Sequence, residues 1–163
     1  MVYYIIIRGP LGCGKSTISE ILAKKLKAKH ISYDRILDKH KLTEDKEEGM
    51  ISRKSFLKAN KIILPEVKKY LNKGKIVIFD GNFYWKEQID DLINKLNYDH
   101  FVFTLKVPLK VCIKRDSKRS KKHGKWAAMA VHNAVTKFDY GIVIDNEKKS
   151  VNEATEEIIV RLK

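Results

Sequence analysis

The chain has 163 residues, with 34 Lys and Arg against 20 Asp and Glu, which gives a formal net charge of +14. This length predicts one compact domain over residues 1–163, because chains of roughly 100–200 residues bury most of their apolar surface around a single core. Hydrophobic residues make up 44% of the chain, which excludes an intrinsically disordered protein despite the high charge.

Two further counts bear on the location of the protein. The longest uncharged apolar run covers residues 2–7, far below the roughly 18 residues that span a bilayer, so no membrane span is predicted. The two cysteines, Cys13 and Cys112, are too few for a disulfide framework and lack the spacing of metal ligands. These features favour a protein of the reducing cytoplasm.

Hydrophobic periodicity predicts strands that alternate with helices along the chain. In chain order, the first half gives a strand at 2–7, a helix at 15–27, a strand at 30–32 and a helical stretch at 37–71 with a polar interruption at 41–49. The second half gives a strand at 75–80, a helix at 85–96, a strand at 101–107, a helix after Pro108, a helix up to about residue 138, a strand at 141–145 and a helix at 151–162. Pro65 is expected to bend or restart the long helical stretch, and Ser150 with Glu153 to form a capping box. Because parallel strands need crossover connections, this order predicts an α/β fold, a three-layer α/β/α sandwich with about five mostly parallel strands.

Most of the positive charge lies in two segments. Residues 53–75 carry a net charge of +7, and residues 106–125 carry a net charge of +8. One interpretation is a solvated, lysine-rich surface that keeps the protein soluble, and the other is a binding surface for a polyanionic partner.

The most specific motif lies between the first strand and the first helix. It matches G-x-x-x-x-G-K-[ST] at every fixed position, and its residues are Gly9, Pro10, Leu11, Gly12, Cys13, Gly14, Lys15 and Ser16. Backbone N–H groups of such a loop hold phosphates at the N-terminus of the helix. Lys15 would reach the β- and γ-phosphates, the Ser16 hydroxyl would bind Mg²⁺, and Thr17 would contact the α-phosphate. We therefore expect ATP and Mg²⁺ to bind here, with Cys13 only filling space.

Missing motifs narrow the class of nucleotide-binding protein. The guanine-reading N-K-x-D sequence is absent, because residues 94–97 end in Asn97, and this disfavours a GTPase. The third strand ends in Asp80 without a following Glu, so the carboxylate that polarises water in motor ATPases is missing. Phosphoryl transfer is therefore favoured over hydrolysis.

Two carboxylates and two arginines complete the candidate site. Asp34 follows the second strand, where strand ends line the ligand crevice, and is predicted to be the general base; an N-cap role is the alternative. Asp80 is predicted to partner Mg²⁺ through water or through Ser16. Arg115 and Arg119 are four residues apart on a predicted helix, so we expect Arg115 at the phosphates and Arg119 near the adenine or the phosphates, with solvated arginines as the alternative.

These motifs together resemble the P-loop kinase superfamily. They are the loop at 9–16, the Asp34-Arg35 pair, Asp80-Gly81-Asn82 and Arg115-x-x-x-Arg119, in that order. The branch that they resemble most holds polynucleotide kinases, zeta-toxin-like kinases and the kinase domain of seryl-tRNA kinase, with AAA-type ATP-binding domains of uncharacterised kinases.

The resemblance implies a P-loop NTPase fold of the nucleotide-kinase type. It implies a helical acceptor-binding insertion at about residues 36–72 and a lid at about residues 115–130. It also implies Lys15 as the phosphate clamp, Asp34 as the base and Arg115 as the lid cation.

The leading hypothesis is an ATP- and Mg²⁺-dependent kinase that transfers the γ-phosphate to a hydroxyl. The two basic segments fall on the insertion and on the lid, which makes a polynucleotide or RNA hydroxyl a candidate acceptor, because Lys and Arg supply most non-specific affinity for nucleic acid. A kinase for a small molecule (a nucleoside, nucleotide or metabolite) is the alternative. A regulatory module that binds ATP without transferring phosphate is the second alternative.

Overall fold

The computed structural model describes residues 1–120 and 122–163. Five strands form one sheet in the order β2-β5-β1-β6-β7, and each pair of neighbours is parallel. Their bounds are Tyr3–Arg8 for β1, Lys29–Ser32 for β2, Val77–Gly81 for β5, Asp99–Lys106 for β6 and Ile142–Asp145 for β7. The predicted α/β fold with five parallel strands is confirmed.

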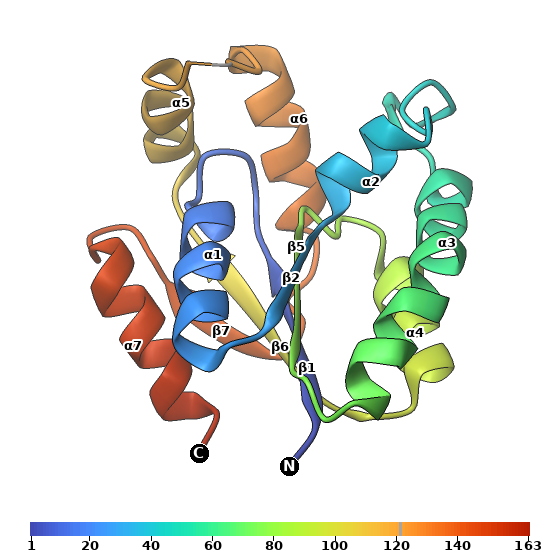
Figure 1. Cartoon of the computed structure of the whole chain (residues 1–163). Helices are drawn as coiled ribbons and strands as arrows, with labels where there is room; N and C mark the ends of the chain where they lie inside the picture. Colours follow the sequence, from blue (N-terminus) through green and yellow to red (C-terminus); the bar gives the residue numbers. More distant parts are fainter. Residues whose placement is uncertain (121) are drawn as a thin grey trace.

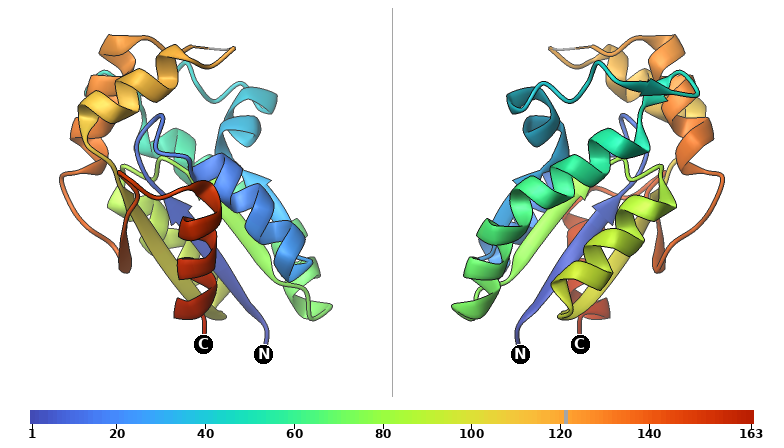
Figure 2. Two further views of the ribbon diagram at one scale, coloured as in Figure 1. Left: turned by 90° about the vertical axis from the view of Figure 1, so that its left-hand side faces the viewer. Right: turned by 90° about the vertical axis from the view of Figure 1, so that its right-hand side faces the viewer.

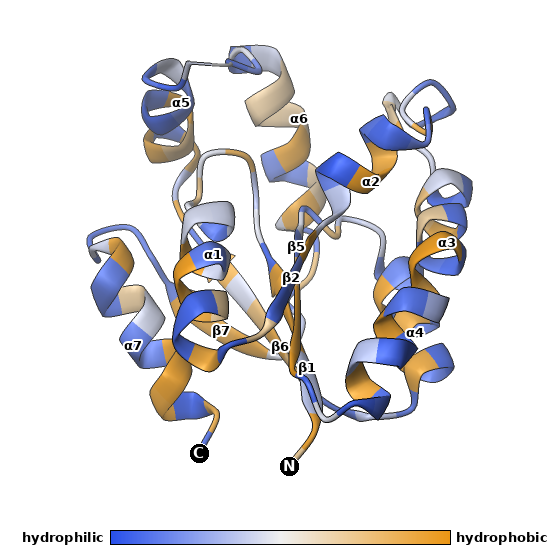
Figure 3. Ribbon diagram, viewed as in Figure 1, coloured by the Kyte–Doolittle hydropathy of each residue, from blue (hydrophilic) through white to orange (hydrophobic). Residues whose placement is uncertain are grey.

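Helices cover both faces of this sheet (Figures 1 and 2). Helices α1 (Lys15–Leu26) and α7 (Val151–Arg161) pack on one face, and α3 (Arg53–Asn72) and α4 (Lys86–Leu96) on the other. Because successive side chains of a strand point to opposite faces, Tyr4 and Ile6 of β1 enter the core under α3 and α4, while Ile5 and Ile7 enter the core under α1. Much of β5 and β7 is coloured as hydrophobic, whereas the helices alternate between the two colours (Figure 3).

Three helices lie beyond the carboxyl ends of the strands, at the end of the molecule opposite both termini (Figure 1). They are α2 (Tyr33–Lys39), α5 (Leu109–Ser117) and α6 (Lys125–Val135). In a parallel sheet this end carries the ligand crevice, so these helices surround the candidate site.

The segment between α2 and α3 departs from the prediction of a plain polar interruption. It contains an antiparallel hairpin of β3 (Lys46–Glu47) and β4 (Met50–Ile51). Its turn residues Glu48 and Gly49 both have positive φ, 53° and 76°, as the two-residue turns that suit twisted hairpins require.

Pro65 does not restart the helical stretch, because α3 runs as one helix from Arg53 to Asn72. Its buried stripe includes Phe56, Ile63 and Val67, which pack into the core. Burial of each such side chain stabilises the helix by roughly 1.5–3 kcal/mol, enough together to outweigh the roughly 3 kcal/mol that an internal proline costs.

The capping box at the start of α7 is confirmed. Ser150 Oγ accepts a hydrogen bond from the Glu153 N–H at 3.1 Å, and Glu153 Oε2 accepts one from the Ser150 N–H at 2.7 Å. Among the described residues, no helix combines the length and the apolar character that crossing a membrane requires.

Candidate active site

The loop between β1 and α1 has the backbone that its sequence predicts. Gly12 and Gly14 both have positive φ, 78° and 92°, and α1 begins at Lys15. A Cβ on Gly12 would lie 2.4 Å from the carbonyl oxygen of Cys112, so the tight approach of α5 to the loop also requires glycine there. The loop thus opens α1 with its N–H groups free to face an anion.

A pocket of about 410 Å³ lies over this loop, and we call it the loop pocket. The residues lining it that sequence reasoning had predicted are Gly12, Gly14, Lys15, Ser16, Thr17, Arg115 and Arg119. The others are Asn146, Lys149, Ser150 and Val151, which sequence reasoning missed. These four follow the carboxyl end of β7, and the rule that strand ends line the crevice could have found them.

The remaining residues of the motif stabilise the conformation of the loop. The Pro10 carbonyl accepts hydrogen bonds from Lys15 Nζ at 3.1 Å and from the Cys13 N–H at 3.3 Å. The Cys13 carbonyl accepts a bond from Asn146 Nδ2 at 2.8 Å, which ties the loop to the segment after β7. Burial raises the pKa of the Cys13 thiol, so this side chain is a neutral filler. Gly9 leaves room for that thiol, since a Cβ there would lie 2.6 Å from Cys13 Sγ.

The two residues predicted to serve Mg²⁺ lie together. Ser16 Oγ donates a hydrogen bond to Asp80 Oδ1 at 3.3 Å, although the two residues are 64 positions apart. Asp80 is 1% exposed, and its other oxygen contacts His30 Nε2 from β2. A hydroxyl beside a buried carboxylate suits Mg²⁺, which prefers oxygen ligands and keeps several of its waters.

The two predicted arginines reach the loop pocket from different local structures. Arg115 lies in the last turn of α5, and its Nη2 donates to the Asn146 and Glu147 carbonyls at 3.2 Å each. The prediction that Arg119 shares this helix was wrong, because α5 ends at Ser117. Arg119 instead follows the helix and lies 3.9 Å from Asp116 Oδ1, yet it still lines the pocket.

A second pocket of about 470 Å³ adjoins the first, and Arg119 lines both. We call it the hairpin pocket, because residues of the β3–β4 hairpin form part of its wall. Its polar lining residues are Asp34, Asp38, Lys46, Asn82, Arg119 and His123, and its apolar ones are Leu11, Met50, Ile51, Tyr84, Ala127, Ala130 and Val131, with Gly49.

Asp34 lies in the first turn of α2 and faces this second pocket. Its alternative role as an N-cap was wrong, because Ser32 occupies the N-cap position of α2. The carboxylate is therefore not needed at the helix start. Among the described residues, it has no side-chain hydrogen bond or ion pair that would occupy it.

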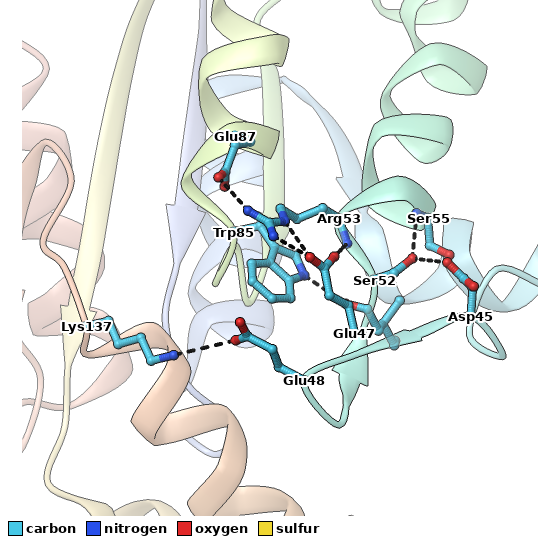
Figure 4. Close-up of polar contacts among 10 residues, drawn as sticks. Asp45, Glu47, Glu48, Ser52, Arg53, Ser55, Trp85, Glu87 and Lys137 are labelled. Carbon is cyan, nitrogen blue, oxygen red and sulfur yellow. Dashed lines mark hydrogen bonds and ion pairs between the residues drawn. The ribbon is translucent and has the colours of Figure 1, made fainter.

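A polar network holds the hairpin against α3 and α4 (Figure 4). Arg53 Nε donates to Glu47 Oε1 at 2.8 Å, and its Nη1 donates to Glu87 Oε1 at 2.9 Å. The indole of Trp85 donates to the Ile51 carbonyl at 2.8 Å, and the Arg53 guanidinium lies 4.9 Å from the centre of its ring. These contacts fix the outer wall of the hairpin pocket.

The basic segment on α3 does not flank the pockets as expected. None of its residues lines either pocket; Arg53 pairs with glutamates, and the lysines that follow, Lys54, Lys58, Lys61, Lys68, Lys69, Lys73 and Lys75, are exposed. In the other segment, Arg115 and Arg119 reach a pocket, whereas Lys121 lies outside the described residues. For α3, the interpretation as a solvated surface fits the structure better.

Comparison with known proteins identifies the family. The sequence model described as "AAA domain" matches residues 5–138, which is most of the chain. The chain belongs to this AAA domain family. Its position in the P-loop kinase superfamily agrees with the residues that line the loop pocket. The finer placement in the polynucleotide kinase branch is not supported by these comparisons.

Curated relatives of this AAA domain protein include adenylate kinases of Mesomycoplasma hyopneumoniae strains 7448 and J. Each is 34% identical over 124 residues, covering 71% of this chain and 57% of the relative. The chain thus spans little more than half the length of these relatives.

Solved structures of similar fold carry other kinase names. A sugar kinase from Janibacter sp. HTCC2649 has a TM-score of 0.81 at 15% identity, covering 99% of this chain and 95% of its own. A gluconokinase from Sinorhizobium meliloti 1021 has a TM-score of 0.72 at 15% identity, with 98% and 92% coverage. At this identity the likeness establishes the fold, which is that of kinases with a phosphate-binding loop.

Proposed function

We propose that this protein is an ATP- and Mg²⁺-dependent phosphotransferase that moves the γ-phosphate of ATP to a hydroxyl group of a small molecule. One observation carries the proposal: two pockets adjoin at Arg119, one over the phosphate-binding loop and one lined by the carboxylate of Asp34. A donor and an acceptor can therefore bind side by side, as in-line transfer requires.

The residues of the two pockets have different roles in the transfer. The loop N–H groups and Lys15 hold the β- and γ-phosphates, and Arg115 and Arg119 neutralise charge on the transferring group. Asp34 accepts the proton of the acceptor hydroxyl as its oxygen forms a bond to the γ-phosphorus. The bond from that phosphorus to the bridging oxygen breaks, and ADP leaves with the electron pair.

The chain also offers a place for the metal ion. Ser16 and Asp80, joined by the 3.3 Å hydrogen bond, fit Mg²⁺ because both present oxygen atoms beside the loop. When bound there, Mg²⁺ would neutralise charge on the β- and γ-phosphates. His30 would hold the Asp80 carboxylate in place through its contact with Oδ2.

A small acceptor is supported over a nucleic acid. The hairpin pocket has a volume of about 470 Å³, which suits a small molecule, and it is walled by the hairpin and α6. The exposed lysines of α3 do not line the hairpin pocket, so they would not guide a polyanion into that pocket. The names of similar proteins, adenylate kinase, sugar kinase and gluconokinase, also favour a small-molecule acceptor.

Asp34→Asn tests the assignment of the base. The amide keeps the shape but accepts no proton, so kcat should fall about 10²–10⁴-fold while the affinity for ATP stays near wild type. The matched variant Asp38→Asn changes a carboxylate one turn further along α2, and we expect it to alter the acceptor KM without this loss in kcat. Equal kcat values for Asp34→Asn and the wild type would remove Asp34 from the mechanism.

A further inference from the structure

Arg8 is a fully buried arginine at the carboxyl end of β1, directly before the phosphate-binding loop. Its side chain lines neither pocket. Burial lowers its pKa to about 10, so it keeps its charge at neutral pH. Burial of a guanidinium costs free energy unless each N–H donor has a hydrogen-bond partner. The partners of Arg8 therefore indicate its structural role.

Within residues 1–120 and 122–163, every hydrogen-bond partner of this guanidinium is neutral. Nη2 donates to the Val135 carbonyl at 2.9 Å, and Nη1 donates to the Phe138 carbonyl at 3.1 Å and to Thr104 Oγ1 at 3.0 Å. Nε donates to the Phe83 carbonyl at 3.3 Å. The guanidinium carbon also lies 4.3 Å from the centre of the Phe138 ring. One guanidinium thus forms hydrogen bonds with the backbone of several separate segments.

Two of these segments contribute to the lining of the hairpin pocket. Val135 is the last residue of α6, and the same helix places Ala127, Ala130 and Val131 in the pocket lining. A cation at this helix end satisfies a carbonyl that lacks an intrahelical partner and opposes the negative end of the helix dipole.

The other segment is the connection between β5 and α4. Phe83 has a positive φ of 47° and is flanked by Asn82 and Tyr84, both of which line the hairpin pocket. A non-glycine residue in this conformation is strained, so it persists only where its surroundings hold it. The bond from Arg8 Nε to the Phe83 carbonyl is one such restraint.

We propose that Arg8 is a positioning residue for the acceptor, which sets the spacing between α6 and the Asn82–Tyr84 segment. This inference rests on the proposed function, in which the hairpin pocket holds the acceptor. Lysine could not replace the arginine here, because its single ammonium cannot span partners on both walls as the planar fork of a guanidinium does.

The hydrogen bonds that hold the loop pocket are separate from those of Arg8. The restraints of the loop pocket are the Lys15 and Cys13 bonds to the Pro10 carbonyl and the bond from Asn146 Nδ2 to the Cys13 carbonyl. The partners of Arg8 do not include them. Loss of the guanidinium should therefore separate the two substrates: acceptor binding changes and ATP binding does not.

Arg8→Lys is the main test, and Thr104→Val is a milder one that keeps the arginine and removes one of its partners, together with the bonds between Thr104 and the Tyr140 backbone. For Arg8→Lys we expect the acceptor KM to rise about tenfold or more, since small displacements of a binding wall are costly, with the Kd for ATP within about twofold of wild type. Thr104→Val should shift the same constant in the same direction by less. Thr155→Val, a buried threonine of α7 on the other face of the sheet, is the matched control and should leave both constants unchanged.

Amide hydrogen exchange gives a second readout that requires no acceptor. Arg8→Lys should speed exchange in both residues 81–85 and residues 131–138, and leave α1 and α7 as in the wild type. Exchange that rises in only one of these segments, or an ATP Kd that rises as much as the acceptor KM, would overturn the role of Arg8. If the wild type transfers phosphate to no small molecule, the proposed function fails, while paired exchange would still support the link between the two walls.

Discussion

The two pockets of this protein are built in different ways. The loop pocket draws five of its eleven lining residues from the motif, between Gly12 and Thr17, and the rest are Arg115, Arg119 and the segment after β7. The hairpin pocket draws on six segments, which are the loop, α2, the hairpin, the connection after β5, the connection between α5 and α6, and α6, with no more than four residues from any one of them. The motif therefore determines the phosphate-binding part of the donor side, whereas the acceptor side depends on how distant segments pack.

This difference explains why the acceptor is the harder substrate to identify. Phosphates need N–H groups, a lysine and a helix end, and these have a fixed spacing in the chain. An acceptor needs only a shaped cavity with a few polar groups, which many sequences can supply. The predictions that follow test whether the two pockets respond separately to substitution.

Lys15→Met should have the largest effect and should act on the loop pocket. The lysine is 6% exposed and is the cation of the loop, so its loss should lower kcat/KM about 10²–10³-fold or more. Direct titration with ATP should show weakened binding, while acceptor binding measured without nucleotide stays unchanged. Unaltered ATP binding in this variant would contradict the placement of the phosphates.

Asp80→Asn should raise the Mg²⁺ concentration needed for half-maximal activity about 10–100-fold, because the change removes the charge that supports the metal. Electron paramagnetic resonance in the presence of ATP measures Mn²⁺ binding directly, and this binding should be lost in the variant. Asp99→Asn, an exposed carboxylate at the start of β6, is the control and should bind Mn²⁺ as the wild type does.

Arg119→Met should affect both pockets, because this side chain lines both. Loss of a charge-assisted contact predicts a rise of about tenfold in the KM for ATP and in the KM for the acceptor. Arg115→Met, whose side chain lines only the loop pocket, should raise the KM for ATP and leave the KM for the acceptor unchanged, and both variants should lower kcat because each arginine neutralises charge on the transferring group. Steady-state kinetics with each substrate varied in turn separates these outcomes, and identical profiles for the two variants would contradict the shared position of Arg119.

Ser150→Ala should have the smallest effect on catalysis. It removes the capping box of α7 and should lower the free energy of unfolding by about 1 kcal/mol, measured by urea denaturation. Because Ser150 also lines the loop pocket, a small rise in the KM for ATP is expected, with no change in the acceptor KM. Glu153→Gln weakens the same cap from outside the pocket lining and is the control.

Much of the fold followed from the sequence, because each strand and helix carries a strong local pattern. The run from Tyr3 to Ile7, the glycines of the loop and the Ser150–Glu153 cap each specify their own conformation. The hairpin at residues 46–51 escaped prediction because two strands of two residues each carry no hydrophobic period. Pro65 does not restart α3, because burial of the α3 stripe outweighs a local preference.

The parts of the candidate site that come from one short stretch of sequence were the most predictable. The motif located the residues from Gly12 to Thr17, and the positions of Asp34 and Asp80 followed from the ends of strands. Lys46 was missed because only the packing of the hairpin brings it to a pocket, whereas Asn146 follows the end of β7 and was within reach of the same strand-end rule. The lysines of α3 contribute to the net charge of +14 but lie outside the lining of both pockets, so they do not indicate the acceptor.

A transfer assay with γ-labelled ATP tests the central claim most directly. The acceptors are a panel of small polyols, sugars, nucleosides and nucleoside monophosphates, with RNA and DNA oligonucleotides alongside, each at 50 and 200 mM salt. We predict label transfer to a small hydroxyl compound at a rate that changes little with salt and that Asp34→Asn abolishes. Transfer to oligonucleotides alone, with affinity falling about 10³–10⁵-fold between the two salt concentrations, would contradict the account. Phosphate release that needs no acceptor would contradict it equally.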